Sequence, residues 1–325
     1  MRGRTACISI DLDALGHYAA IHGLAQGVLA PGGDDAVARL APDRLSELLA
    51  ELGVHGTFFA VGQDLLRQGP PDGGELAGAE PLRRAARAGH EIGNHSQHHR
   101  YDLAALTPER IAREVHGGAE AIAAVVGTRP VGFRAPGYTL SAPLLAAVHA
   151  AGHRYDSSTF PAVPYYLAKA AVMGSLRLRG RPSKALLDRP RVLMAPCLPY
   201  RPDAREPYAR GGLPLWEIPI STAPGTRLPF IGTAVATLPD LALDLLYRSV
   251  RRRPILNLEL HGIDLMDESD GAGPRLARAQ RDLRIPAARK IARLRRLLHR
   301  ISTDYEIVTL AELAERLERQ SPPVL

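Results

Sequence analysis

The hydrophobic positions along the chain fall into two kinds of pattern, short apolar runs and longer stretches with a helical repeat. Most of the short runs are separated by helical stretches, and strands that alternate with helices favour a parallel sheet covered by helices. Eight runs have the length and composition of buried strands: Ala6–Ile10, Thr57–Val61, Glu91–Asn94, Val131–Arg134, Tyr155–Ser157, Glu217–Ile220, Ile255–Leu260 and Glu306–Leu310.

Helical repeats fill most of the intervals. In Ala38–Leu52 the leucines fall near one face of a helix. Thr107-Pro108, a capping residue followed by proline at the first helical position, opens a helix that runs to about Val126. Further helices are predicted over Ser141–Ala150, Leu241–Arg251 and Leu276–Arg300, the last broken at Pro286. About eight such units in one chain favour a (β/α) barrel over two separate domains.

One region departs from this alternation. Phe160–Leu215 is rich in Pro, Arg and Tyr and contains a candidate amphipathic helix, Tyr165–Leu178. We therefore expect a single catalytic domain over residues 1–325 with an irregular insertion at about 160–215 over one face of the barrel. The insertion is a substrate lid, a membrane-docking element or only a long connection.

Composition narrows the class of protein. The chain is 46% hydrophobic, which excludes a disordered or collagen-like protein, and no apolar run reaches the length of a membrane span. Two cysteines, Cys7 and Cys197, exclude a disulfide scaffold and suit a reducing compartment. Residues 1–4 lead into a strand-like run without the apolar core of a signal peptide, which favours the cytoplasm.

The net charge of +7 is concentrated in a basic helical segment, residues 271–325, which holds 12 Lys and Arg against 6 Asp and Glu. The simplest interpretation is a solvated amphipathic helix. The alternatives are attraction to an anionic membrane, as a peripheral protein at the inner membrane face, or to a phosphate-bearing substrate. No aromatic platform or zinc-finger spacing accompanies the charge, so a nucleic-acid partner is not expected. Oligomerisation is left open.

Ionisable residues gather just past the ends of the predicted strands. In a barrel of parallel strands these ends open onto one face, where active sites assemble. The residues are Asp11, Asp13, His95, His99, Arg134, Asp156 and His261.

Two of these groups have the composition of a metal site. His95 and His99 are four residues apart, so a helical turn would bring both imidazoles to one side. With one carboxylate they make the His₂-carboxylate set of a catalytic Zn²⁺ site. Asp11 and Asp13 point the same way if the segment is extended, and two adjacent carboxylates are costly unless a cation neutralises one or they share a proton. This favours Asp13 as a ligand and Asp11 as a free base, although a capping histidine pair and two loop acids also fit each pattern.

Two further residues have alternative interpretations. His261 ends the most hydrophobic run and is either a structural histidine or a general acid toward a leaving amine, its ring oriented by Asp264 or Asp156. Arg134 precedes a Pro-Gly turn and is either a surface salt bridge or a clamp that keeps Asp11 ionised.

In their order along the chain, from residue 8 to residue 264, these motifs resemble those of the polysaccharide deacetylase family, also called NodB-homology or carbohydrate esterase family 4. The similar segments are Asp11-Leu12-Asp13, His95-Ser96-Gln97-His98-His99, Arg134-Ala135-Pro136-Gly137-Tyr138, Tyr155-Asp156-Ser157-Ser158 and Leu258-Glu259-Leu260-His261. The Asp-x-Asp opening and the Pro-Gly-Tyr turn are closer to the intracellular peptidoglycan-deacetylase-like and amide-hydrolase branch than to secreted chitin deacetylases.

The resemblance implies a distorted (β/α)₇-type barrel and a divalent metal, usually zinc, bound at Asp13, His95 and His99. It implies that Asp11 is the catalytic base, with Arg134 as its electrostatic partner, and that His261 is the general acid. The backbone N–H of Gly137 would contribute to the oxyanion hole. Tyr138, Asp156 and Asp264 are candidates for binding or orienting roles.

The implied activity is metal-dependent hydrolysis of an N-acyl amide, foremost N-acetyl, on an amino sugar or polysaccharide. The same motifs leave two alternatives. One is a deformylase or deacetylase of a lipid-linked amino sugar at the inner membrane face. The other is a catalytically inactive carbohydrate-binding scaffold.

Overall fold

The computed structural model describes residues 3–24, 27–66, 78–178, 180 and 187–320. Each of the eight predicted strands is present in these ranges, several of them shorter than expected. They are β1 (Thr5–Asp11), β2 (Thr57–Ala60), β3 (Glu91–Asn94), β4 (Gly132–Phe133), β5 (Tyr155–Asp156), β6 (Trp216–Glu217), β7 (Ile255–His261) and β8 (Glu306–Ile307).

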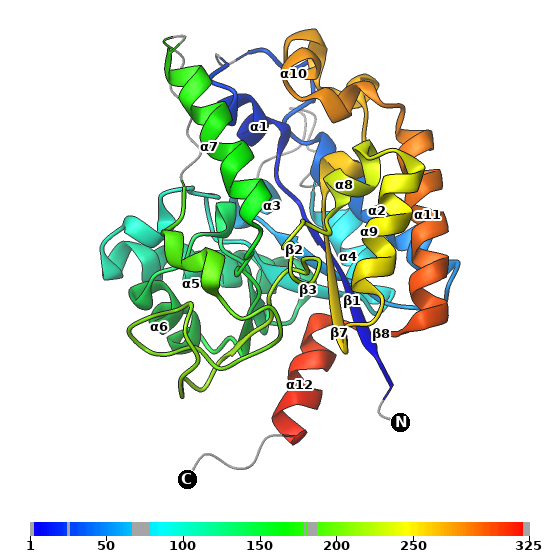
Figure 1. Cartoon of the computed structure of the whole chain (residues 1–325). Helices are drawn as coiled ribbons and strands as arrows, with labels where there is room; N and C mark the ends of the chain where they lie inside the picture. The colour runs from blue at the N-terminus through cyan, green and yellow to red at the C-terminus, as the bar shows by residue number, and fades with distance from the viewer. Residues whose placement is uncertain (1–2, 25–26, 67–77, 179, 181–186, 321–325) are drawn as a thin grey trace.

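All pairings between these strands are parallel. The order in the sheet is β6-β5-β4-β3-β2-β1-β7, and β8 pairs with the first residues of β1. The backbone N–H of Ser221, in the segment after β6, donates to the Asn257 carbonyl oxygen of β7 at 3.0 Å, which joins the two ends of the sheet. The predicted barrel of parallel strands with outer helices is confirmed (Figure 1).

Long helices cover the outside of the barrel. They are α2 (Ala36–Ala50), α4 (Ala79–Arg87), α5 (Pro108–Val126), α6 (Ala142–Ala150), α9 (Asp240–Val250), α11 (Ala287–Asp304) and α12 (Leu310–Gln320). The predicted helices agree with these within a few residues, and α5 begins at Pro108 as its capping signal indicates. The predicted break at Pro286 is confirmed, because α11 begins directly after it.

Shorter or projecting elements lie mostly around the carboxyl ends of the strands. They are α1 (Leu15–Ile21), α3 (Gly62–Leu66), α7 (Val163–Leu178), α8 (Gly232–Thr237), α10 (Gly273–Ala279) and the 3₁₀ turn Arg281–Arg284. Parts of two predicted regions, residues 179 and 181–186 of the insertion and 321–325 of the basic segment, lie outside the described residues. Among the described helices, none is both long enough and apolar enough to span a bilayer.

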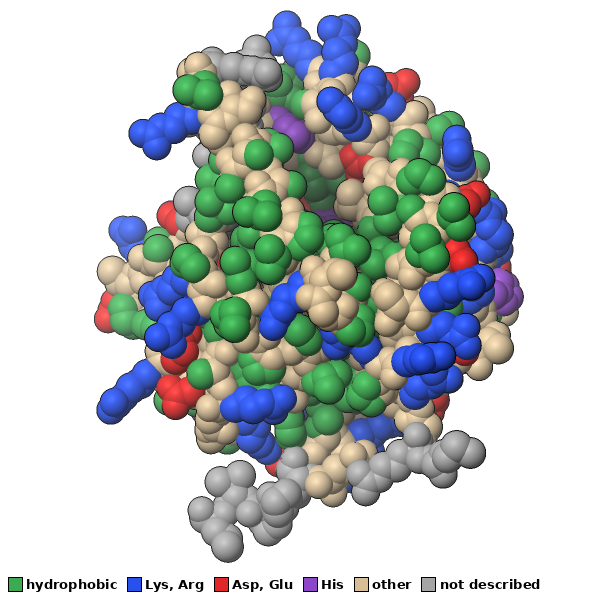
Figure 2. All heavy atoms as spheres, viewed as in Figure 1, with side chains coloured by type: hydrophobic (Ala, Val, Ile, Leu, Met, Phe, Trp, Pro, Cys, Tyr) green, Lys and Arg blue, Asp and Glu red, His purple; other side chains and the backbone are tan. Residues whose placement is uncertain are grey.

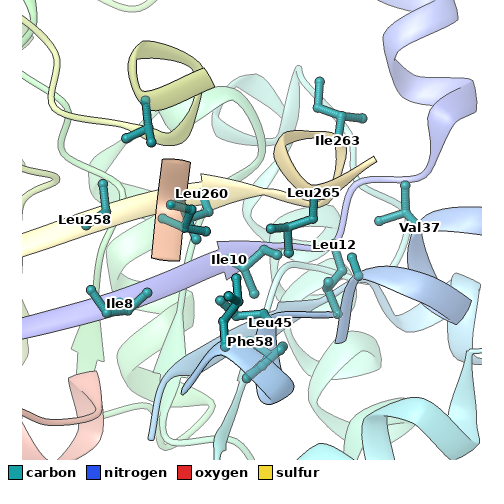
Figure 3. Close-up of a cluster of buried hydrophobic side chains, with 14 of the residues drawn as sticks. Ile8, Ile10, Leu12, Val37, Leu45, Phe58, Leu258, Leu260, Ile263 and Leu265 are labelled. Atoms are coloured by element: carbon teal, nitrogen blue, oxygen red, sulfur yellow. The ribbon is translucent and has the colours of Figure 1, made fainter. Parts of the chain in front are cut away.

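The alternation of side chains along β1 separates an apolar layer from a polar one. Ile8, Ile10 and Leu12 point toward the helix side of the sheet, where they meet Phe58 and Leu45 (Figure 3). The intervening Ser9 and Asp11 therefore lie on the other face, inside the barrel. The hydrophobic core thus lies between sheet and helices, and the barrel interior is free to hold polar groups.

Two buried histidines make the stability of this fold depend on pH. His153 Nε2 lies 3.2 Å from the side-chain nitrogen of Asn94, and His90 Nδ1 accepts a hydrogen bond from the Gly56 N–H. Burial lowers the pKa of each histidine to about 4. The unfolded chain, whose histidines titrate near about 6.5, therefore binds protons first as the pH falls.

These two histidines contribute a fall in the free energy of unfolding between about pH 6.5 and pH 4, of up to about 1.4 kcal/mol per pH unit each. Urea unfolding at pH 7.0 and pH 5.0 measures the slope. The His153→Gln variant should lose less stability between the two pH values than the original protein does. An unchanged slope in that variant would show that His153 does not titrate in this way.

Candidate functional site

A cavity of about 260 Å³ opens at the carboxyl ends of the strands. Six of the residues singled out in the sequence line it: Asp11, Asp13, His95, Gly137, Tyr138 and His261. A wider groove of about 600 Å³ lies elsewhere, around Trp216 and α12, and of the residues singled out in the sequence none lines it. The cavity therefore lies at the ends of the strands, as the sequence predicts.

Asp13, His95 and His99 converge on one point. Asp13 Oδ1 lies 3.1 Å from His95 Nε2 and 3.0 Å from His99 Nε2, and all three side chains are buried. His95 Nδ1 lies 2.7 Å from the Arg134 carbonyl oxygen, to which only an N–H can donate. In neutral His95 the Nε2 atom then carries no proton, and its lone pair faces the Asp13 carboxylate oxygen.

This arrangement fits a divalent cation. Asp13 Oδ1 and His99 Nε2 have no hydrogen-bond partner among the described residues, although both are buried. Lone pairs and a carboxylate oxygen that converge without a proton between them repel one another unless a cation lies among them. The donor set of two imidazoles and one carboxylate is the set typical of catalytic zinc.

The histidine pair is brought together by a turn and not by the expected helical turn. Ser96 and His99 both have left-handed backbone angles, φ 67° and 49°. The Ser96 hydroxyl accepts the His99 N–H at 3.1 Å, which closes the turn. The intervening His98 points outward instead, its Nδ1 2.8 Å from Glu114 Oε1 and its side chain 56% exposed.

Arg134 lies beneath the cavity, inside the barrel, with no exposed surface. Its Nη1 donates to Asp11 Oδ1 at 2.7 Å, its other N–H groups donate to Ser9 and Ser157, and its guanidinium lies 4.2 Å from the centre of the Phe59 ring. This buried ion pair shows that the surface salt bridge is wrong, and the clamp that keeps Asp11 ionised stays a prediction. Burial raises the pKa of Asp11, and the charge of Arg134 opposes that rise.

His261 is held by a residue that the sequence analysis missed. Its Nδ1 lies 2.9 Å from Glu259 Oε1, and its Nε2 lies 3.1 Å from the Tyr138 hydroxyl at the cavity. Burial alone lowers the pKa of His261, but the Glu259 carboxylate outweighs burial and raises it well above its usual range. The signal was available: Glu259 is the single acid in an apolar strand, two residues before the histidine and thus on the same face.

The expectation that Asp156 or Asp264 orients the His261 ring is corrected by this contact. Asp264 accepts the backbone N–H of His261 at 2.8 Å, and burial raises the pKa of Asp264 to about 7. Asp156 is fully buried and accepts from the N–H and hydroxyl of Ser158. Because the Ser158 hydroxyl oxygen also accepts the Ala135 N–H, Asp156 supports the loop after Arg134.

The loop after Arg134 brings the backbone of Gly137 and Tyr138 to the edge of the cavity. Gly137 has φ 66°, and a Cβ there would lie 2.9 Å from the Tyr101 ring, so both the backbone angle and the space require glycine. Tyr138 follows with φ 62° and a buried ring that reaches His261. The opposite wall comes from α7, through the apolar side chains of Tyr165, Val172 and Met173 and the cationic Lys169.

Comparison with known proteins supports this fold. The chain matches the 20%-identical structure of a putative polysaccharide deacetylase from Mycobacterium smegmatis with TM-score 0.59, over 100% of this chain and 94% of that one. The PuuE allantoinase structure matches at 16% identity and TM-score 0.58, over 99% and 93%. A carbohydrate esterase family 4 pseudoenzyme from Bacillus anthracis is 11% identical with TM-score 0.47, over 96% and 66%. No curated protein matches.

The first two of these structures share the distorted (β/α)₇-type barrel with this chain. Residues 34–155 match the family model described as polysaccharide deacetylase. This segment includes the histidine turn and Arg134, which meet Asp11 and Asp13 at the cavity described above. The chain is therefore similar to polysaccharide deacetylases over this segment, and its fold is that of the two structures.

Proposed function

We propose that this protein hydrolyses an N-acyl amide on an amino sugar or polysaccharide, with N-acetyl as the first candidate for the acyl group. We propose that the reaction uses a divalent metal, with zinc as the first candidate. The observation that carries the proposal is the convergence of His95 Nε2 and His99 Nε2 on Asp13 Oδ1 within one cavity. The cavity also holds Asp11 and His261, each with a buried partner of opposite charge.

Asp13, His95 and His99 would hold the metal. When bound, such a metal would polarise the acyl oxygen and lower the pKa of water to about 7. The N–H of His95 that donates to the Arg134 carbonyl fixes the orientation of the imidazole, as in other metal sites where a ligand histidine has an outer partner.

The other residues manage protons. Asp11, fixed by Arg134, accepts a proton from the attacking water as its oxygen bonds to the acyl carbon. His261, fixed by Glu259, gives a proton to the amine as the carbon–nitrogen bond breaks. The Gly137 N–H donates to the acyl oxygen as its negative charge develops, an interaction worth about 3 kcal/mol. The products are a carboxylic acid and a free amine.

A second candidate is a deformylase or deacetylase of a lipid-linked amino sugar at the inner membrane face. The apolar side chains that α7 contributes to the cavity beside Lys169 favour it, because a polysaccharide presents mainly hydroxyl groups to such side chains. Location in the cytoplasm, with or without membrane contact, stays a prediction under either candidate.

The test combines elemental analysis of the purified protein with a panel of N-acetylated and N-formylated saccharides, scored for released acetate or formate. We expect about one zinc per chain and acid release from at least one class of sugar. A metal-loaded protein that releases no acid from any member would instead support the inactive carbohydrate-binding scaffold.

A further inference from the structure

Helix α7 carries apolar side chains on opposite sides, yet it does not lie in the core. One side, including Lys169, Val172 and Met173, lines the cavity. On the other side Leu167 is 67% exposed and Leu178 is 90% exposed. A helix that is hydrophobic around its circumference is normally buried in a protein core or in a membrane.

The charges on α7 are of one sign. Among residues 163–178 only Lys169 and Arg177 are charged, and the segment contains no acid. Helices that bind a membrane interface carry Lys and Arg beside apolar residues, and the composition of α7 is of this kind.

The basic segment of the sequence divides into two parts in the structure. On α11, Arg295 pairs with Glu51, Arg300 with Asp244, and Arg293 is buried against Asp240. Two other arginines of α11, at positions 289 and 296, are exposed and have no acidic partner among the described residues. On α10 and the turn after it, all four exposed arginines lack an acidic partner within the described part of the chain. They are Arg275, Arg278, Arg281 and Arg284.

The unpaired arginines and α7 lie at the same end of the molecule. Both flank α1 at the carboxyl ends of the strands (Figure 1). His22, which follows α1, contacts Gln280, which follows α10, at 2.8 Å, and Ile21 of α1 lines the cavity together with α7. Figure 2 shows the surface hollowed between α7 and α10. The entrance to the cavity therefore lies between an apolar helix and a cationic one.

We propose that this end of the protein docks on an anionic lipid bilayer. Leu167 and Leu178 of α7 enter the interface, and the arginines of α10 and the following turn contact lipid phosphates. Docking goes beyond the proposed function, because it requires no hydrolysis, and it places the cavity entrance at the membrane surface. Apolar residues beside unpaired cations are complementary to an anionic bilayer, whose acyl chains are apolar and whose headgroups carry negative charge.

Co-sedimentation of the full chain with vesicles tests the proposal. Vesicles of phosphatidylglycerol and phosphatidylcholine are compared with vesicles of phosphatidylcholine alone, at low and at physiological salt. We expect at least about tenfold tighter binding to the anionic vesicles, weakened by salt because the attraction is screened. Equal binding to both vesicles, or none to either, would overturn the proposal.

Matched variants separate this surface from overall charge and hydrophobicity. Arg278→Glu with Arg281→Glu should weaken binding at least about tenfold. Arg252→Glu with Arg319→Glu, the same charge change at exposed residues near the opposite ends of the strands, should not. Leu167→Ser with Leu178→Ser should weaken binding in the same way, whereas Leu241→Ser with Leu245→Ser on α9 should leave it unchanged. A control pair that weakens binding as much as its partner pair would contradict the proposed surface.

A second readout distinguishes this inference from the proposed function. Hydrolysis of a water-soluble N-acyl amino sugar should be the same in the α7 and α10 variants as in the original protein, because none of the four changed residues lines the cavity. Hydrolysis without vesicle binding would overturn the docking surface alone. Vesicle binding without hydrolysis would overturn the proposed activity alone.

Discussion

Replacing Asp13 by alanine is expected to remove bound metal and N-acyl hydrolysis together. Among the described residues, this carboxylate is the one negatively charged group that both His95 Nε2 and His99 Nε2 face at hydrogen-bond distance. Without it only two imidazoles would remain to hold a cation that would lower the pKa of water, so kcat/KM should fall at least about a thousandfold. Elemental analysis and acid release measure the two effects on the same preparation.

His98→Ala is the matched control, because His98 belongs to the same turn but points outward to Glu114. This variant should keep its metal and most of its activity. If Asp13→Ala retained one metal per chain, or if His98→Ala lost it, the assignment of the ligands would be wrong.

The Asp11→Asn variant should differ from Asp13→Ala in its metal content: it should keep the metal and still lose turnover. Asparagine keeps the shape of the side chain but cannot accept the proton, so kcat should fall about 10²- to 10⁴-fold, the range of a general base. The variant also leaves the buried guanidinium of Arg134 without its nearest counter-charge, and breaking a buried ion pair commonly costs about 3–5 kcal/mol. Thermal unfolding must therefore accompany the kinetics, and rates are expressed per folded chain.

Asp156→Asn tests whether this loss is specific. Asp156 is also a buried carboxylate at a strand end, but its contacts are with Ser158 and Glu217 and not with the cavity. It should lose less than about tenfold in kcat, since no proton transfer is assigned to it. Near-normal turnover in Asp11→Asn would show that another group is the base.

The barrel and the centre of the site were predictable because both follow from strand ends. Apolar runs of strand length locate β1 and β7, and parallel pairing puts Asp11 directly beside His261 in the register. Residues that follow those strands must then meet, whatever their separation along the chain. The pairing of Asp11 with Arg134 follows in the same way, because both lie at carboxyl ends of strands in one barrel.

What could not be predicted depends on side-chain direction and on exposure. Glu259 sits inside a run that was interpreted only as apolar, so its contact with His261 was missed. The left-handed angles of Ser96 and His99 have no glycine to signal them. The sequence likewise does not separate the paired arginines of α11 from the unpaired ones near α10, because the acids that pair with them come from distant helices.

One missed element had a signal in the sequence. The run Glu306–Leu310 was interpreted as a strand, but β8 ends at Ile307 and α12 begins at Leu310. Thr309 and Glu312 form a reciprocal cap: the Thr309 N–H donates to Glu312, and the Glu312 N–H donates to the Thr309 hydroxyl. Thr-x-x-Glu before an apolar stretch is a helix-start pattern.

The burial of Arg134 has a practical consequence for trapping a substrate in crystals. Silencing the protein at Asp11 weakens the barrel, because the same guanidinium that holds Asp11 also ties Ser9 to Ser157 inside it. Replacing His261 is a better choice for a stable inactive variant, because its side chain is 20% exposed. The Glu259 carboxylate that would lose its histidine partner still lies near the favourable positive charge of Arg134. An intact ligand soaked into such a variant would reveal which sugar the cavity accepts.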